Sequence, residues 1–191
     1  MRRLILIAFL ISAPAVAQLQ IYLLNASFEG EPQDATVPSG WIPCQAGTTP
    51  DILPGVWGVY QEPVHGDTYM GLITRENGTW ESVGQRLKTA LSPGQCFAMS
   101  LSLAHSNTYA GYKLPLKLRI WGGAERCEQD QLLWESPLIE HREWKTYRFD
   151  FVPRASIQYL IIEAFHQEGN FSYRGNILID RLSAIKKCIR A

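Results

Sequence analysis

Beyond its first residues the sequence lacks any long apolar run, and it lacks an excess of charge of either sign. Lysine and arginine total 18, and aspartate and glutamate also total 18, so the formal net charge near neutral pH is zero. No cluster of basic residues resembles the stripes that follow nucleic acid phosphates. These absences argue against nucleic acid as a partner and against a membrane span in the body of the chain, since a spanning helix needs roughly 20 apolar residues.

The familiar signatures of catalysis are also missing. There is no Gly-x-Ser-x-Gly elbow and no His-Glu-x-x-His helix, and the histidines are scattered at His65, His105, His141 and His166. Glu76 and Glu81 flank an Asn-Gly turn, and paired carboxylates are what glycoside hydrolysis requires. Two acids around a turn are equally typical of solvated surface. We therefore expect a protein that is not an enzyme.

The N-terminal residues are the exception to the lack of apolar runs. Arg2 and Arg3 precede the apolar stretch Leu4–Ile11, and Ala15-Val16-Ala17 stands before Gln18. A short basic region, an apolar core and small residues at a cleavage point are typical of a secretory signal peptide. Residues 1–17 are predicted to be removed, which makes the protein secreted: periplasmic, cell-surface or extracellular. An N-terminal membrane anchor or a core helix is the alternative.

The four cysteines remain in the predicted exported chain. An even number in an oxidising compartment favours two disulfides over four thiols, and no C-x-x-C or Cys/His spacing suggests zinc. Three pairings are possible. Cys96 begins one predicted strand and Cys127 follows a Gly-rich turn after the next, so we expect Cys96 to pair with Cys127 and Cys44 with Cys188.

Period-two alternation and β-branched or aromatic runs recur along the chain, without a sustained helical stripe. With about 174 residues after cleavage, we expect residues 18–191 to form a single domain, an all-β, two-sheet antiparallel jelly-roll sandwich. The segment from Gly30 to Pro54 reads mostly as loop. The expected strands are Ile21–Phe28, Val56–Tyr60, Tyr69–Thr74, Trp80–Leu87, Cys96–Ser106, Leu114–Trp121, Leu132–Glu135, Lys145–Val152, Ile157–Phe165 and Ile177–Ile185.

The alternation within two strands indicates which faces are buried. In Leu114–Trp121 four large apolar side chains share one face, leaving Lys117, Arg119 and Trp121 on the other. In Cys96–Ser106 the face opposite the large apolar side chains carries small residues such as Ser100 and Ser102. If these two strands are neighbours in one sheet, the small side chains leave room for a ligand beside Trp121.

A series of short motifs runs through the chain: Asn25-Ala26-Ser27-Phe28-Glu29, Gly40-Trp41, Leu91 to Phe97, Trp144 to Phe151 and Ile179-Asp180-Arg181-Leu182-Ser183. Together they resemble the galactose-binding-like β-sandwiches, especially carbohydrate-binding modules of families four, nine and twenty-two. The opening is also similar to secreted surface domains of Bacteroidota. In that family the opening Glu and closing Asp commonly help to hold a structural calcium, which implies Glu29 and Asp180 as metal ligands here; ordinary turn residues are the alternative.

The resemblance and the aromatic content lead to one functional hypothesis. A secreted, non-catalytic module would recognise a glycan or another cell-surface polymer by stacking sugar rings on exposed aromatic faces. Trp121 and Arg119 are the first candidates, because an apolar ring beside a five-donor guanidinium suits a sugar. The further candidates are Tyr60, Trp80, Tyr109 and Tyr112. The alternative is a structural or adhesion module, of the gliding or attachment type, that packs on a neighbouring surface protein and binds no sugar.

Overall fold

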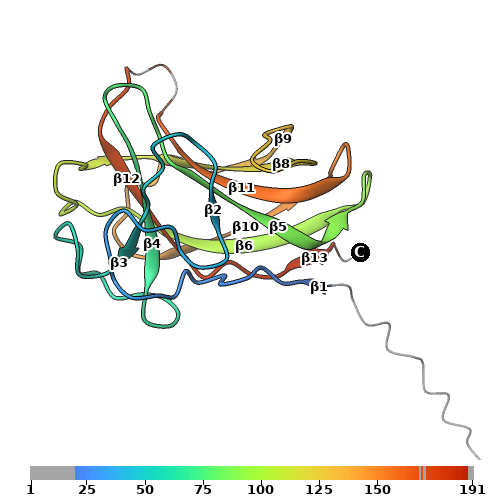
Figure 1. Cartoon of the computed structure of the whole chain (residues 1–191), viewed down its shortest axis with the longest axis horizontal. Helices are drawn as coiled ribbons and strands as arrows, with labels where there is room; N and C mark the ends of the chain where they lie inside the picture. Colours follow the sequence, from blue (N-terminus) through green and yellow to red (C-terminus); the bar gives the residue numbers. More distant parts are fainter. Residues whose placement is uncertain (1–19, 168, 170, 189–191) are drawn as a thin grey trace, which may run out of the picture.

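The computed structural model describes residues 20–167, 169 and 171–188. The predicted signal peptide therefore lies outside the described residues. Within them all regular structure is β (Figure 1), which confirms the predicted fold class of a two-sheet antiparallel sandwich. The described part of the chain contains no helix long and apolar enough to cross a bilayer.

The two sheets draw on strands that are far apart in sequence. One has the order β2 (Ile42–Pro43), β5 (Ser82–Leu91), β11 (Ile157–Phe165), β8 (Lys117–Gly123) and β9 (Gln131–Glu135). The other has the order β1 (Gln20–Ile21), β13 (Ile185–Lys187), β6 (Phe97–Ala104), β12 (Gly175–Asp180), β4 (Tyr69–Thr74) and β3 (Asp51–Leu53), with β10 (Lys145–Phe151) beside β6 and β7 (Leu114–Pro115) beside β12. We call them the five-stranded and the eight-stranded sheet.

The main core lies between the sheets. Leu118 and Ile120 of β8 and Leu101 and Leu103 of β6 belong to one buried cluster, as their period-two alternation predicts. However, β8 and β6 lie in different sheets, so the condition that they are neighbours is not met, and the small side chains of β6 do not lie beside Trp121. Local alternation identifies the buried face of a strand but not its partner.

A second, smaller core covers part of the outer face of the eight-stranded sheet. On β12 Ile177 and Ile179 face the main core, whereas Leu178 belongs to the second cluster together with Tyr69 and Tyr109. Loops close over this face, so β12 is buried throughout. This second core supports the loops that form the candidate site at one end of the sandwich.

Two strand predictions were also wrong. Of the predicted strand Ile21–Phe28 only Ile21 lies in a strand, β1. Val56–Tyr60 is a turn and not a strand, because Trp57 and Gly58 have φ of 52° and 77°, in the left-handed region. The segment from Gly30 to Pro54 is mostly loop, as predicted, and contains two short strands, β2 and β3, which pair with β5 and β4.

Two disulfides are present, as predicted, but their pairing differs from the prediction. Cys44 is bonded to Cys127 and Cys96 to Cys188. Cys96 precedes β6 and Cys188 follows β13, and because these strands pair, the Cys188 N–H donates to the Cys96 carbonyl at 3.1 Å. Cys127 lies in the β8–β9 turn of the other sheet, beyond the reach of Cys96.

Candidate functional site

The outer face of the five-stranded sheet carries the first candidates from the sequence. Arg119 and Trp121 alternate with buried Leu118 and Ile120 on β8, so both side chains point away from the main core, as expected. The Arg119 Nε donates to Glu135 at 2.6 Å, and its guanidinium lies 3.6 Å from the centre of the Phe165 ring. Arg119 is thus held in place by an ion pair and a ring.

A buried carboxylate organises the aromatic side chains of this face. Glu163 accepts hydrogen bonds from the indole nitrogens of Trp80 and Trp121, at 3.1 and 3.2 Å, and from the Gln129 amide at 2.6 Å. Glu163 is only 2% exposed. A buried charge requires such partners, so the two indoles are fixed in place.

Part of the same face is closed by the chain itself. The Cys44–Cys127 disulfide lies over Gly84 of β5, where a Cβ atom would come within 2.7 Å of the Cys44 sulfur. Ile161 of β11, on the same side of the sheet, is fully buried. Beyond the disulfide a cavity of about 300 Å³ is lined by Arg86, Arg126 and Tyr159 among others. The disulfide therefore covers part of the outer face on which Trp121 lies, and less of this face is open to a ligand than the alternation in β8 indicated.

The most developed aromatic and polar site lies at the loop end of the second core. Two cavities, of about 90 and 240 Å³, share Arg75 and Tyr112. Trp57 lines the first and is 44% exposed, and Arg174 lines the second. The Arg174 guanidinium lies 4.4 Å from the centre of the Tyr112 ring. We call Trp57, Arg75, Tyr112 and Arg174 the loop-end pocket.

Asp51 lies beneath this pocket and fixes its aromatic rings. It accepts hydrogen bonds from the Tyr109 hydroxyl and from the Ala35 N–H at 2.8 Å, and the Trp57 side chain lies near enough to lower its pKa. Burial raises the pKa of the Asp51 carboxyl, and these hydrogen bonds oppose that rise. Burial likewise raises the pKa of the Tyr109 hydroxyl well above its ordinary value. Every partner of Asp51 belongs to the framework of the pocket.

A second acid anchors the arginine of the pocket. Glu81 is fully buried and accepts bonds from the Arg75 guanidinium at 2.7 Å, from Thr49 and from the Ile73 N–H. Burial raises the pKa of Glu81, and the Thr49 N–H and Arg75 counteract the rise. Both Glu81 oxygens are occupied by protein donors, which is the environment of a structural carboxylate. The pattern of two acids around the Asn-Gly turn therefore reflects one buried anchor and one exposed residue, Glu76.

The carboxylates of Glu29 and Asp180 lie on either side of one loop. Oδ2 of Asp180 accepts the N–H groups of Val64 and His65, at 2.7 and 3.0 Å. Oε2 of Glu29 accepts the N–H groups of Asp67 and Thr68, at 3.0 and 3.2 Å. In each group the other oxygen, Asp180 Oδ1 or Glu29 Oε1, is buried without a hydrogen-bond partner.

Two buried oxygens without donors are costly unless something else satisfies them. Burial raises the pKa of Asp180, and repulsion from Glu29 adds to the rise, against hydrogen bonds from His65, Val64 and Arg181. Carboxylate oxygens are the ligands that calcium prefers. The two oxygens without donors therefore fit a calcium ion, and calcium binding at this place stays a prediction.

The predicted binding residues thus separate into different surfaces. Trp80, Trp121 and Arg119 lie on the outer face of the five-stranded sheet, whereas Tyr109 and Tyr112 lie at the loop-end pocket. Tyr109 is fully buried, so it supports the pocket from below, and Tyr60 is 73% exposed. Ligand binding by Trp121 and Arg119 stays a prediction.

Sequence reasoning missed Trp57, Arg75 and Arg174. Trp57 stands between Gly55 and Gly58, and glycines that bracket an aromatic residue are typical of a turn that presents it. Arg75 and Arg174 carry no such local signal. They meet at the pocket because Thr74 pairs with Gly175 across β4 and β12.

The sandwich is similar to several solved structures. The cyclase Fisc from Fischerella sp. TAU has a TM-score of 0.61 and 14% identity over 92% of this chain and 100% of that one. The CBM22-1 xylan-binding domain of Paenibacillus barcinonensis Xyn10C gives 0.55 and 13%, covering 93% and 100%. The K3 adhesin domain of Lys-gingipain from Porphyromonas gingivalis gives 0.56 and 14%, covering 88% and 99%.

These similarities show a shared fold. The expected resemblance to carbohydrate-binding modules and surface domains is therefore confirmed at the level of the sandwich. No protein-family model matches the sequence, and no characterised protein compared with it is similar in sequence.

Proposed function

We propose that this chain is a non-catalytic recognition module that binds a saccharide chain in the loop-end pocket. The observation that carries the proposal is the exposed Trp57 ring, which lines one cavity together with Arg75, Tyr112 and the buried Asp51. Sugar recognition requires an apolar face for the ring and fixed polar groups for the hydroxyls. The Trp57 carbonyl accepts the Ala110 N–H at 2.9 Å, and a presenting turn that is held in place reduces the entropy lost when a ligand binds.

The acids near the pocket support binding over catalysis. The oxygens of the two buried acids, Glu81 and Asp51, are occupied by donors from the protein, as described above. Glu76, which lines the second cavity, is a single exposed carboxylate. A general acid or nucleophile must reach the reacting bond. The solved neighbours include a xylan-binding domain and an adhesin domain, but also a cyclase, so turnover is measured alongside binding.

The proposed function is tested by titrating the purified chain with xylohexaose and by screening it on an array of neutral glycans. Trp57→Ala should weaken binding to the saccharide found by at least about tenfold, as expected for an aromatic anchor. Tyr60→Ala, which removes an exposed ring that lines neither cavity of the pocket, is the matched control. Chromatography of the incubated saccharide should show no product.

Three outcomes would contradict the proposal. Equal affinity of wild type and Trp57→Ala would show that the saccharide does not bind in the loop-end pocket. Loss of binding in Trp121→Ala would instead favour the outer face of the five-stranded sheet, which the sequence predicted. A blank glycan screen together with capture of a surface protein would instead favour the adhesion alternative.

Two further expectations accompany this proposal. A calcium ion held by Glu29 and Asp180 would be structural: it would neutralise the two carboxylates and fix the loop between Val64 and Thr68. Secretion is supported by the two disulfides, because such bonds persist in oxidising compartments.

A further inference from the structure

A groove runs along the outer face of the eight-stranded sheet, beyond the second core. Its floor is β6, where Ala98 and Ser100 present small side chains outward. Arg148 of β10 lies opposite Ser100, and Lys186 of β13 lies opposite Ala98. Two cavities, of about 490 and 390 Å³, share Ser100, Arg148 and Ser183, and so form one continuous groove.

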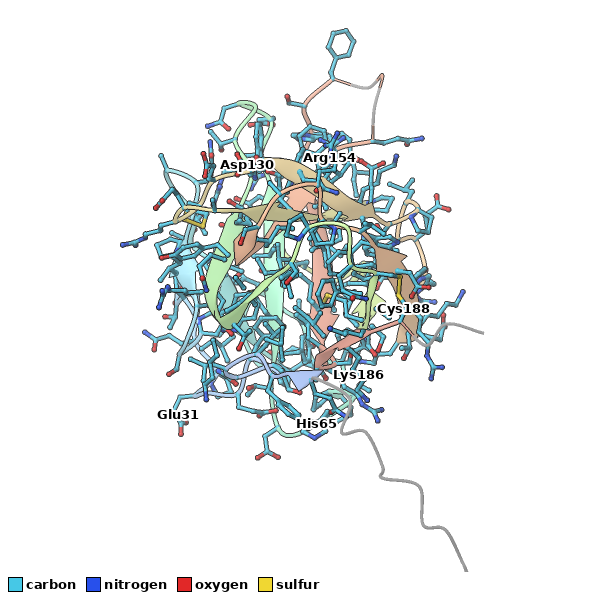
Figure 2. All side chains as sticks on the ribbon, turned by 90° about the vertical axis from the view of Figure 1, so that its right-hand side faces the viewer. Glu31, His65, Asp130, Arg154, Lys186 and Cys188 are labelled. Carbon is cyan, nitrogen blue, oxygen red and sulfur yellow. A yellow bond between two sulfur atoms is a disulfide. The ribbon has the colours of Figure 1, made fainter. Side chains whose placement is uncertain are left out.

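The groove is rich in positive charge. Arg148 and Arg181 line the larger cavity with His65, and no acidic residue lines it. The smaller cavity adds Lys186 and one acid, Asp150. Figure 2 shows His65 and Lys186 in the lower part of the molecule, with Arg154 far above them. The protein as a whole has no net charge, so this concentration of cations is local.

The guanidinium groups of the two arginines in the groove are available to a ligand. Among the described residues, none forms a hydrogen bond or an ion pair with the guanidinium of Arg148 or Arg181, and both residues are exposed. Arg181 has a φ of 54°, a left-handed conformation that glycine adopts more easily. Strained backbone of this kind clusters at ligand sites.

The walls between these arginines are fixed by hydrogen bonds. Ser183 donates its N–H to the Ser100 carbonyl at 2.8 Å, and its hydroxyl accepts the Ser100 N–H at 2.9 Å. On the other side of the larger cavity, the Ser27 hydroxyl is 3.0 Å from Nδ1 of His65. The groove therefore exists before a ligand arrives.

We propose that this groove binds sulfate esters carried on a saccharide chain, with Arg148 and Arg181 as the anion-binding residues. A guanidinium presents a planar fork of donors that matches the oxygens of an oxyanion in a bidentate manner. The groove is longer than one such group requires, and Lys186 extends the positive charge along it. This proposal does not rest on the loop-end pocket, which is built from other residues.

The experiment compares short dextran sulfate with unmodified dextran of the same length by titration calorimetry, with calcium present throughout. Dextran sulfate should bind and dextran should not. Arg148→Ala and Arg181→Gly should each weaken binding by about tenfold or more, since each removes hydrogen bonds to a charged group. The glycine variant also suits the left-handed backbone at position 181, so it tests charge without disturbing the fold.

The matched control is Arg154→Ala, which removes the same charge from an exposed position elsewhere (Figure 2) and should change the affinity by less than about twofold. Equal losses in all three variants would reduce the effect to general electrostatic attraction and overturn the site. Inorganic sulfate and phosphate form separate arms: if they bind as tightly as dextran sulfate, the saccharide assignment is overturned. Trp57→Ala should leave dextran sulfate binding unchanged, which separates this proposal from the proposed function.

Discussion

Trp80 and Trp121 donate their indole N–H groups to opposite oxygens of the same buried carboxylate, that of Glu163. The first residue precedes β5 and the second lies on β8, so β11, which carries Glu163 between them, joins two aromatic side chains from separate parts of the sequence. The face that we expected to bind a ligand therefore has a structural role of its own.

This arrangement predicts a stability change for Trp121→Phe. Phenylalanine keeps an aromatic ring but removes the N–H, and one oxygen of Glu163 then loses its donor. We expect the free energy of unfolding to fall by about 1–3 kcal/mol in urea denaturation. The matched control, Tyr60→Phe, removes a hydroxyl from an exposed ring and should stay within about 0.5 kcal/mol of wild type. Equal stability of the two variants would show that the Glu163 hydrogen bond contributes nothing.

The disulfide between Cys96 and Cys188 predicts a larger effect. These residues are 92 positions apart, and in the chain-entropy description closing a loop of that length stabilises the fold by about 4.6 kcal/mol. The double variant Cys96→Ser, Cys188→Ser should lose stability of this order in a denaturant titration. Peptide mapping without reduction should find Cys44 joined to Cys127; a Cys44–Cys188 peptide would contradict the structure.

Calcium should stabilise the folded chain through Glu29 and Asp180. An ion that binds only the folded state raises the melting temperature as its concentration rises. The variant Asp180→Asn keeps an oxygen for the Val64 and His65 N–H groups but loses the charge, and should abolish the calcium-dependent rise. If wild type melts at the same temperature with calcium and with chelator, and elemental analysis finds no metal, the prediction that the protein binds calcium is wrong.

The same carboxylate predicts a pH dependence in the presence of chelator. Because burial raises the pKa of Asp180 above its ordinary 3.8, the folded protein holds this proton more firmly than the unfolded chain does. Its contribution to stability is present below the ordinary pKa and is lost as the pH rises through the raised value. The stability of wild type relative to Asp180→Asn should therefore fall with increasing pH from about 4 upward. A rise in the relative stability would contradict the direction of this pKa shift.

The sequence predicted the faces of the strands better than their partners. Alternation along β6 and β8 shows which side chains become buried, and this is a local property of each strand. Which strand lies beside which depends on contacts across the whole chain. The disulfide pairing failed for this reason: Cys96 was placed beside Cys127 on the assumption that consecutive strands share a sheet.

The candidate site shows the same limit. Trp57 was assigned to a strand because its neighbours alternate, but its left-handed backbone turns the ring outward. Arg75 and Arg174 are ordinary exposed or half-exposed residues in the sequence, and only strand pairing brings them together. In contrast, the family resemblance of the short motifs singled out Glu29 and Asp180 as metal ligands, and the structure places both carboxylates against one loop. Calcium binding by this pair stays a prediction.

The two disulfides also determine how the protein responds to proteolysis. The chain segments that they close, 44–127 and 96–188, overlap. A single peptide-bond cleavage at any position between 44 and 188 therefore leaves the two fragments covalently joined, since at least one of the bonds spans the cut. Nicking of an exposed loop would separate the fragments only after reduction, and a nicked molecule would migrate as intact on a non-reducing gel.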